Sequence, residues 1–184
     1  MRRNNKIPRL TIITEDKATS LIAQGFINNL VACRQNRCNP IKYTQGWIHA
    51  VEAVKALRPD RQTNDYVVLI IDFDKDWERR YKWIQEQLKD SPHIDRIYVL
   101  GSPVEVEKLL RPMRKHFNDN SLDLEGIGAQ IAQECYDFGH SKSAGCECSG
   151  SAWAEQCLRI NLDVVQRLER DVKPFLFNPW KNII

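Results

Sequence analysis

Carboxylate side chains follow two short apolar segments of this sequence, each at the point where the segment ends. Glu15 and Asp16 come directly after RLTIIT, and Asp72, Asp74 and Asp76 come directly after YVVLII. Carboxylates at positions i and i+2 of an extended chain point to the same side. A third carboxylate from a neighbouring strand end completes an oxygen cage suited to Mg²⁺ or Mn²⁺. We therefore expect a divalent metal on Glu15, Asp72 and Asp74, where it could activate water and neutralise charge on a phosphate.

The other acidic residues have a second explanation. Asp16 and Asp76 each precede a predicted helix, where an aspartate side chain commonly caps the first turn. Asp76 remains a candidate for the same metal site. Three cations, Lys75, Arg79 and Arg80, follow the acidic cluster and could hold a phosphate backbone. A helix also commonly shows Lys and Arg to water, so both readings stay open for them.

Cysteine and histidine residues gather in the C-terminal third of the chain. His140, Cys146, Cys148 and Cys157 fall within 18 residues, and thiolate and imidazole ligands at that density can form a tetrahedral zinc site. The spacing is not that of a standard zinc finger. The alternatives are a structural zinc that ties a loop to the last helix, or free thiols in a loop.

The elements that must position these residues alternate between strands and helices. Periodicity predicts strands over 9–14, 41–44, 66–71 and 94–100. Helices are predicted after each strand, with apolar stripes that begin near Ala18, Trp47, Trp77 and Val106. The last of these has a capping-box pattern at Ser102, Pro103 and Glu105, and we expect that helix to end near Pro112.

Alternating elements with short links predict an α/β fold with a mainly parallel, Rossmann-like sheet flanked by helices over residues 1–112. Ligands of such sheets bind beyond the carboxyl ends of the strands, which is where both acidic clusters fall. Residues 113–184 read as an α-helical C-terminal extension that packs on the same core or on a partner, because its apolar stripes and its tail of Phe and Trp side chains need cover.

Composition limits the classes of protein. The chain has 184 residues, 27 Lys and Arg against 24 Asp and Glu, and a pI near 8.5, which is mildly basic and does not by itself indicate nucleic acid. No apolar run approaches the ~20 residues of a membrane helix, and the start of the chain lacks the apolar region of a signal peptide. We expect a cytoplasmic protein with reduced cysteines and no membrane partner.

The sequence resembles a Toprim domain, the fold shared by topoisomerases, bacterial primases and overcoming-lysogenization-defect nucleases. The matches are Glu15 in TIITEDKAT and Asp72 and Asp74 in VVLIIDFD, and Glu15 with Thr19 is similar to small Toprim-like proteins encoded beside restriction and phage-defence ATPases. Asp16 departs from the Gly that many of these domains carry. The resemblance covers residues 8–112 and implies a Mg²⁺-dependent nuclease that cuts DNA or RNA, in phage defence, with an ATPase partner. It assigns Glu15 as general base or metal ligand.

Three other interpretations use the same residues. An EF-hand loop is excluded, because Trp77 stands where the loop needs Gly and Trp83 where it needs Glu. The run VVLIIDFD also resembles the first motif of haloacid-dehalogenase-like phosphatases, in which Asp72 would be the nucleophile. A non-catalytic Toprim-like module that docks on an ATPase is the third.

Overall fold

The computed structural model describes residues 8–30, 35–57, 65–73, 76–102 and 105–129, together with positions 164, 167, 168, 170–172 and 176. Four strands form one parallel sheet. They are β1 (Leu10–Thr14), β2 (Lys42–Tyr43), β3 (Tyr66–Asp72) and β4 (Ile97–Ser102), in the order β2-β1-β3-β4. The α/β fold class with a parallel sheet flanked by helices is confirmed.

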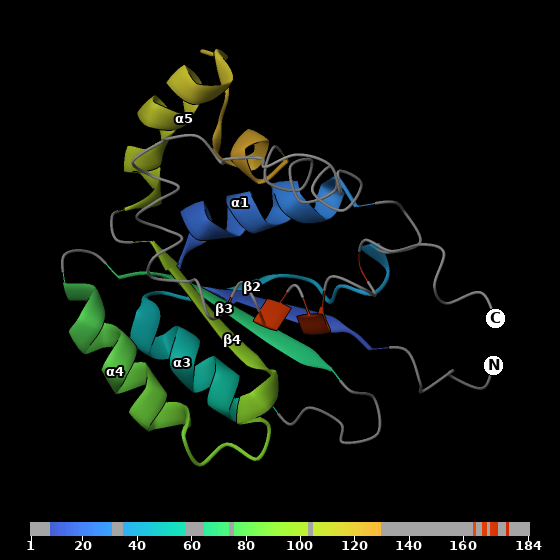
Figure 1. The fold of residues 1–184 in the computed structure, drawn as a ribbon, viewed down its shortest axis with the longest axis vertical. Helices are drawn as coiled ribbons and strands as arrows, with labels where there is room; N and C mark the ends of the chain where they lie inside the picture. The colour runs from blue at the N-terminus through green and yellow to red at the C-terminus, as the bar shows by residue number, and fades with distance from the viewer. Residues whose placement is uncertain are drawn as a thin grey trace.

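The helices cover both faces of this sheet (Figure 1). They are α1 (Lys17–Asn28), α3 (Trp47–Ala56), α4 (Trp77–Leu88) and α5 (Leu110–Phe117), with short 3₁₀ helices η2 (Ile94–Arg96) and η3 (Val106–Leu109). In Figure 1, α1 and α5 lie on one side of the sheet, and α3 and α4 lie on the other. Two helical layers around a parallel sheet explain why its strands are apolar on both faces.

Alternation along the strands divides the core into two layers. Ile13, Leu69 and Ile71 pack with Ala50, Val51 and Val54 of α3 and with Ile84 and Leu88 of α4. The residues between them in sequence, such as Ile12 and Val68, pack with Ala23 and Ile27 of α1. Because successive side chains of a strand point to opposite faces, every second strand residue stabilises the same helical layer.

Part of the region beyond residue 112 packs on this same core. Leu122, Leu124 and Ile127 join Ala18 of α1 and Met113 of α5 in a third buried cluster. Val164, Val172 and Leu176 are buried against the α1 face of the sheet, and the hydroxyl of Tyr98 donates to Asp171 Oδ2 at 2.8 Å. A continuous helix, α5, crosses residue 112.

Close backbone contact fixes α1 against the helical segment 124–129. A Cβ built on Gly25 would lie 1.8 Å from the carbonyl oxygen of Glu125, and a Cβ built on Gly128 would lie 1.9 Å from that of Ile22. Both contacts are to backbone atoms, which cannot rotate away. Glycine is therefore required at both positions for this helix spacing.

Three local predictions were wrong. The strand predicted from Ile94 begins at Ile97, because Ile94–Arg96 forms a 3₁₀ turn. The helix predicted to end near Pro112 continues to Phe117. Pro112 lies in the first turn of α5, where a backbone N–H has no partner within the helix, so its missing donor costs nothing there. Ser102 belongs to β4, and the N-cap residue of η3 is Glu105, which makes no side-chain cap.

No helix in the described part of the chain is long and apolar enough to cross a membrane.

Candidate metal site at the carboxyl edge of the sheet

The strand order places a topological switch point between β1 and β3. These two strands are neighbours in the sheet. The chain leaves β1 into α1 on one face and leaves β3 towards α4 on the opposite face. Connections that diverge in this way leave a crevice outside the carboxyl ends of the two strands, which is where open α/β sheets bind ligands.

Glu15 and Asp72 meet at this switch point. The backbone N–H of Asp72 donates to Glu15 Oε2 at 2.8 Å, although 57 positions separate the two residues. A side-chain carboxyl carbon lies within about 4 Å of its own backbone nitrogen, so the two carboxylates are within roughly 7 Å of each other. We call these two residues the acidic pair. The sequence predicted their proximity from the ends of two strands.

Turns on either side hold Glu15 in place. Asp16 caps α1, with its side chain accepting from the backbone N–H of Thr19 at 2.9 Å, and the hydroxyl of Thr19 completes a capping box. The carbonyl of Glu15 accepts from the backbone N–H of Gly46 at 3.1 Å and from the hydroxyl of Thr44 at 3.2 Å. The predicted cap at Asp16 is thus confirmed, and its carboxylate is hydrogen-bonded to the first turn of α1.

Asp72 is a buried carboxylate, with 7% of the residue exposed. Its Oδ2 accepts from the backbone N–H of Val106, the first residue of η3, at 3.2 Å. The next residue, Phe73, is fully buried and packs edge-on against Tyr81 of α4 at 5.9 Å. Its ring also covers Gly101 of β4. The strand end that carries Asp72 is therefore rigid on both faces of the sheet.

Arg80 contributes a fixed positive charge beside the acidic pair. Its Nη1 donates to the backbone carbonyl of Asp72 at 2.8 Å, and its guanidinium lies 5.5 Å from the ring centre of Trp47. Arg79 instead pairs with Asp76 at 2.7 Å, and its side chain is largely exposed. Of these two predicted phosphate contacts, Arg80 is the one fixed at the site.

Asp76 occupies the N-cap position of α4 but makes no side-chain cap there. Its carboxylate is on Arg79, an i,i+3 ion pair on the exposed surface of the helix. Surface pairs of this kind contribute little to stability. The prediction that Asp76 caps α4 is right in position and wrong in hydrogen bonding.

Several predicted site residues lie outside the described residues. They are Asp74 and Lys75 in the loop after β3, and the candidate zinc ligands His140, Cys146, Cys148 and Cys157. Within the described part of the chain, no group of three or more His, Cys, Asp and Glu side chains is close enough to hold a metal ion. The acidic pair supplies two of the three predicted carboxylates, and hard oxygen ligands on a rigid edge fit Mg²⁺ or Mn²⁺ in type.

Sequence reasoning missed two features of the site. One is the N–H of Val106, since a backbone donor leaves no signal in residue types. The other is Tyr43, whose side chain is 61% exposed at the carboxyl end of β2. No signal for Tyr43 was present in the sequence, because a strand was predicted over 41–44 and only the structure shows that β2 is a two-residue edge strand.

Comparisons with known proteins give no family for this chain. No protein-family model matches it, no curated protein matches it, and no solved structure matches it.

Proposed function

We propose that this protein is a metal-dependent hydrolase of nucleic-acid phosphodiesters, with Glu15, Asp72 and Asp74 as its catalytic carboxylates. The observation that carries the proposal is the contact of Glu15 with Asp72 at the switch point between β1 and β3. This hydrogen bond brings two acidic side chains to one edge of the sheet, where carboxylate oxygens are the ligands that Mg²⁺ prefers. The same three residues are the ones that match Toprim domains. A partner ATPase and a role in phage defence are proposed on that resemblance alone.

The roles follow from the surroundings of each group. Glu15 is half-buried and keeps one carboxylate oxygen on the N–H of Asp72, so its orientation is fixed. Asp72 is held by the N–H of Val106 and provides negative charge on a buried strand end. Arg80, fixed on the carbonyl of Asp72, can contact a phosphate oxygen. A bound Mg²⁺ or Mn²⁺ would supply activation of water and neutralisation of phosphate charge.

The test uses nearly isosteric variants of the acidic pair. Glu15→Gln keeps an oxygen for the N–H of Asp72, and Asp72→Asn keeps an oxygen for the N–H of Val106, while each removes one charge. Asp76→Asn is the matched control, because it removes one nearby carboxylate that lies on the surface with Arg79. Cleavage of supercoiled DNA, single-stranded DNA and RNA is measured with Mg²⁺, with Mn²⁺ and with chelator.

A second readout does not depend on activity. A metal that binds only the folded state stabilises it and so raises Tm. The stabilisation is about 2.7 kcal/mol when the free metal concentration is one hundred times Kd. We expect Mg²⁺ or Mn²⁺ to raise the Tm of the wild type and of Asp76→Asn, and to leave both acidic-pair variants unchanged. In chelator, the Tm of Asp72→Asn should equal or exceed that of the wild type, because the buried charge is gone.

The outcomes separate the interpretations. Metal-dependent cleavage lost in both acidic-pair variants and kept in Asp76→Asn would support the hydrolase. A metal-dependent rise in Tm without cleavage would favour a docking module that retained its metal site. Equal cleavage by wild type and Asp72→Asn would refute the proposal.

A further inference from the structure

We propose that the carboxyl edge of the sheet binds one single strand of nucleic acid, with a base stacked on Tyr43 of β2 and phosphates held by Arg111 and Lys115 of α5. This inference rests on the proposed function for the point of cleavage, and it adds the substrate class and the path of the strand. The two contact surfaces lie on either side of the acidic pair, and each has its own structural basis.

Tyr43 is a large aromatic side chain that remains exposed at the site. It lies in register with Thr14, the residue before Glu15, on the strand next to β1. Its exposed fraction of 61% is the highest among the large hydrophobic side chains of the described residues. Ile48 of α3, also exposed at 46%, adds apolar surface at the start of the next helix. Exposed aromatic rings are the platforms on which unpaired bases stack, whatever their sequence.

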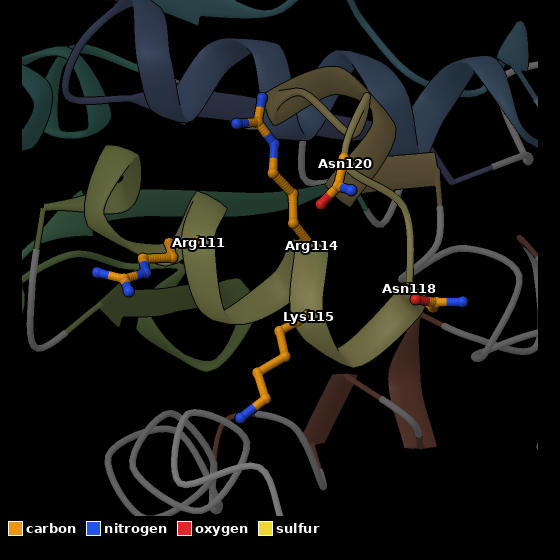
Figure 2. Close-up of a pocket in the computed structure, with 5 residues that line it drawn as sticks. All are labelled: Arg111, Arg114, Lys115, Asn118 and Asn120. Atoms are coloured by element: carbon orange, nitrogen blue, oxygen red, sulfur yellow. The ribbon is translucent and has the colours of Figure 1, made fainter.

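The cations of α5 form a compact surface. A shallow depression of about 440 Å³ is lined by Arg111, Arg114, Lys115, Asn118 and Asn120 (Figure 2). Arg111 and Lys115 are exposed and one helical turn apart, so they share a face of α5. In Figure 2 Arg111 and Lys115 extend away from the ribbon of α5, and Arg114 extends in the opposite direction to Lys115, to the side on which Asn120 lies. There Arg114 Nε donates to the carbonyl of Leu122 at 2.7 Å, which fixes α5 to the segment that follows it.

Neighbouring groups leave this surface positive. No acidic residue occurs between 108 and 118. The terminal carbonyls of Arg114 and Lys115 accept from the N–H of Asn118, which adopts a left-handed conformation, so the helix end exposes less negative charge. The carboxylate of Asp119 accepts hydrogen bonds from the N–H and hydroxyl of Ser121, which hold its negative charge on its own turn. The acids nearest in sequence are Glu107, four residues before Arg111, and Asp119, four residues after Lys115, whose carboxylate is hydrogen-bonded within its own turn.

The acidic pair lies between Tyr43 and the cations of α5 in the fold. Met113 of α5 packs in one cluster with Ala18, three residues after Glu15, and the N–H of Val106 bonds Asp72 directly before η3 leads into α5. At about 4.8 Å per strand, the ends of β2 and β4 are roughly 14 Å apart. The five residues from Val106 to Arg111 add roughly 10 Å at ~2 Å each. With phosphates spaced ~3.4 Å or more along a strand, this path of roughly 24 Å spans at most about seven nucleotides.

A stacked base also selects for single strands. In a duplex each base is already stacked between its neighbours, and its flat faces are not available to a tyrosine ring. A single strand presents those faces, together with a flexible backbone that can follow a bent path from β2 to α5.

The experiment measures binding without cleavage. Fluorescence anisotropy of labelled 12-nucleotide single strands and 12-base-pair duplexes is recorded in chelator over a series of salt concentrations. Because no metal is present, the result does not depend on whether the protein cuts. The variants are Arg111→Gln with Lys115→Gln, Tyr43→Ala, and Tyr43→Phe, which keeps the ring.

A matched control removes the same charge from the opposite edge. Lys55 lies in the last turn of α3 and Lys89 follows the end of α4, both at the amino edge of the sheet. Lys55→Gln with Lys89→Gln lowers the net charge by two, as the α5 double variant does. Inorganic phosphate, added as competitor at the same phosphate concentration as an unlabelled strand, distinguishes a strand site from a small-anion site.

We expect the wild type to bind the single strand more tightly than the duplex. Tyr43→Ala should weaken binding roughly 5- to 150-fold, with Tyr43→Phe near wild type. The α5 double variant should reduce the salt slope by about 1.4, the value for two lost phosphate contacts on a single strand. Equal effects of the α5 and control double variants, tighter duplex binding, or equal displacement by inorganic phosphate would overturn the proposal. If the wild type shows this binding pattern but cleaves no substrate, only the proposed hydrolase activity is refuted.

Discussion

Gly101 of β4 offers a sharp test of how the acidic strand end is supported. A Cβ built there would lie 1.7 Å and 1.9 Å from two ring carbons of Phe73. Carbon atoms that are not bonded stay about 3.5 Å apart or more, so the ring would have to move by about 1.8 Å. The backbone cannot move with it easily, because the N–H of Phe73 donates to the carbonyl of Ser102 at 2.7 Å.

The cost of Gly101→Ala can be estimated from this geometry. Overpacking costs about 1–3 kcal/mol, and expulsion of a buried Phe ring costs about 3–5 kcal/mol. We expect a loss near 3 kcal/mol in the free energy of unfolding. For a chain of this length that corresponds to a fall in Tm of roughly 6–12 °C.

Urea unfolding of a small set of variants measures this effect. Phe73→Leu in the Gly101→Ala background removes ring atoms and should recover at least ~1 kcal/mol as a coupling energy. Gly126→Ala is the matched control, because its new Cβ meets side-chain atoms alone, Leu122 Cδ1 at 2.9 Å and Asp123 Oδ1 at 3.2 Å, and should change stability by less than about 1 kcal/mol. A Gly101→Ala protein as stable as wild type, or additivity with Phe73→Leu, would refute the packing argument.

Two further predictions concern the rest of the core. Tyr98→Phe removes the hydrogen bond to Asp171. Hydrogen bonds from Arg170 and then Tyr98 lower the pKa of the Asp171 carboxyl below its ordinary value of 3.8, so the stabilisation is present above that value and is lost as pH falls through the lowered pKa. The stability difference between wild type and Tyr98→Phe should therefore shrink from pH 6 to pH 3 in urea titrations, and a constant difference would contradict this. Gly25→Ala should cost at least ~2 kcal/mol, because its Cβ meets a backbone carbonyl; an unchanged Tm would show that α1 and segment 124–129 can separate freely.

The alternation of apolar segments was enough to predict the fold class. Strand and helix types around the acidic pair follow from periodicity, and parallel strands bring their carboxyl ends to one edge, so Glu15 and Asp72 could be expected near each other. The direct bond from the N–H of Asp72 to Glu15 could not, because it depends on the register of β1 and β3 to within a single residue.

Local errors have local physical causes. Ile94 has the residue type of a strand, but the N–H groups of Arg96 and Ile97 donate to the carbonyls of His93 and Ile94, which forms a 3₁₀ turn. Pro112 reads as a helix end, yet the helix restarts as α5 two residues before it, which places the proline in a first turn. Asp76 has the right type for a cap, but Arg79 is within reach and takes its carboxylate.

The central place of β1 has a consequence for synthesis of the chain. Leu10 pairs with Tyr66, 56 positions later, and all five residues of β1 are buried in the finished sheet. At about 5–20 residues per second, a ribosome makes that intervening stretch in roughly 3–11 seconds. During this interval β1 has been synthesised, but β3, the strand with which all five of its residues pair, has not. Contacts this distant in sequence also slow folding, because closing a long loop costs entropy before any pairing is gained. The nascent chain is thus most exposed to aggregation and to chaperones before β3 emerges.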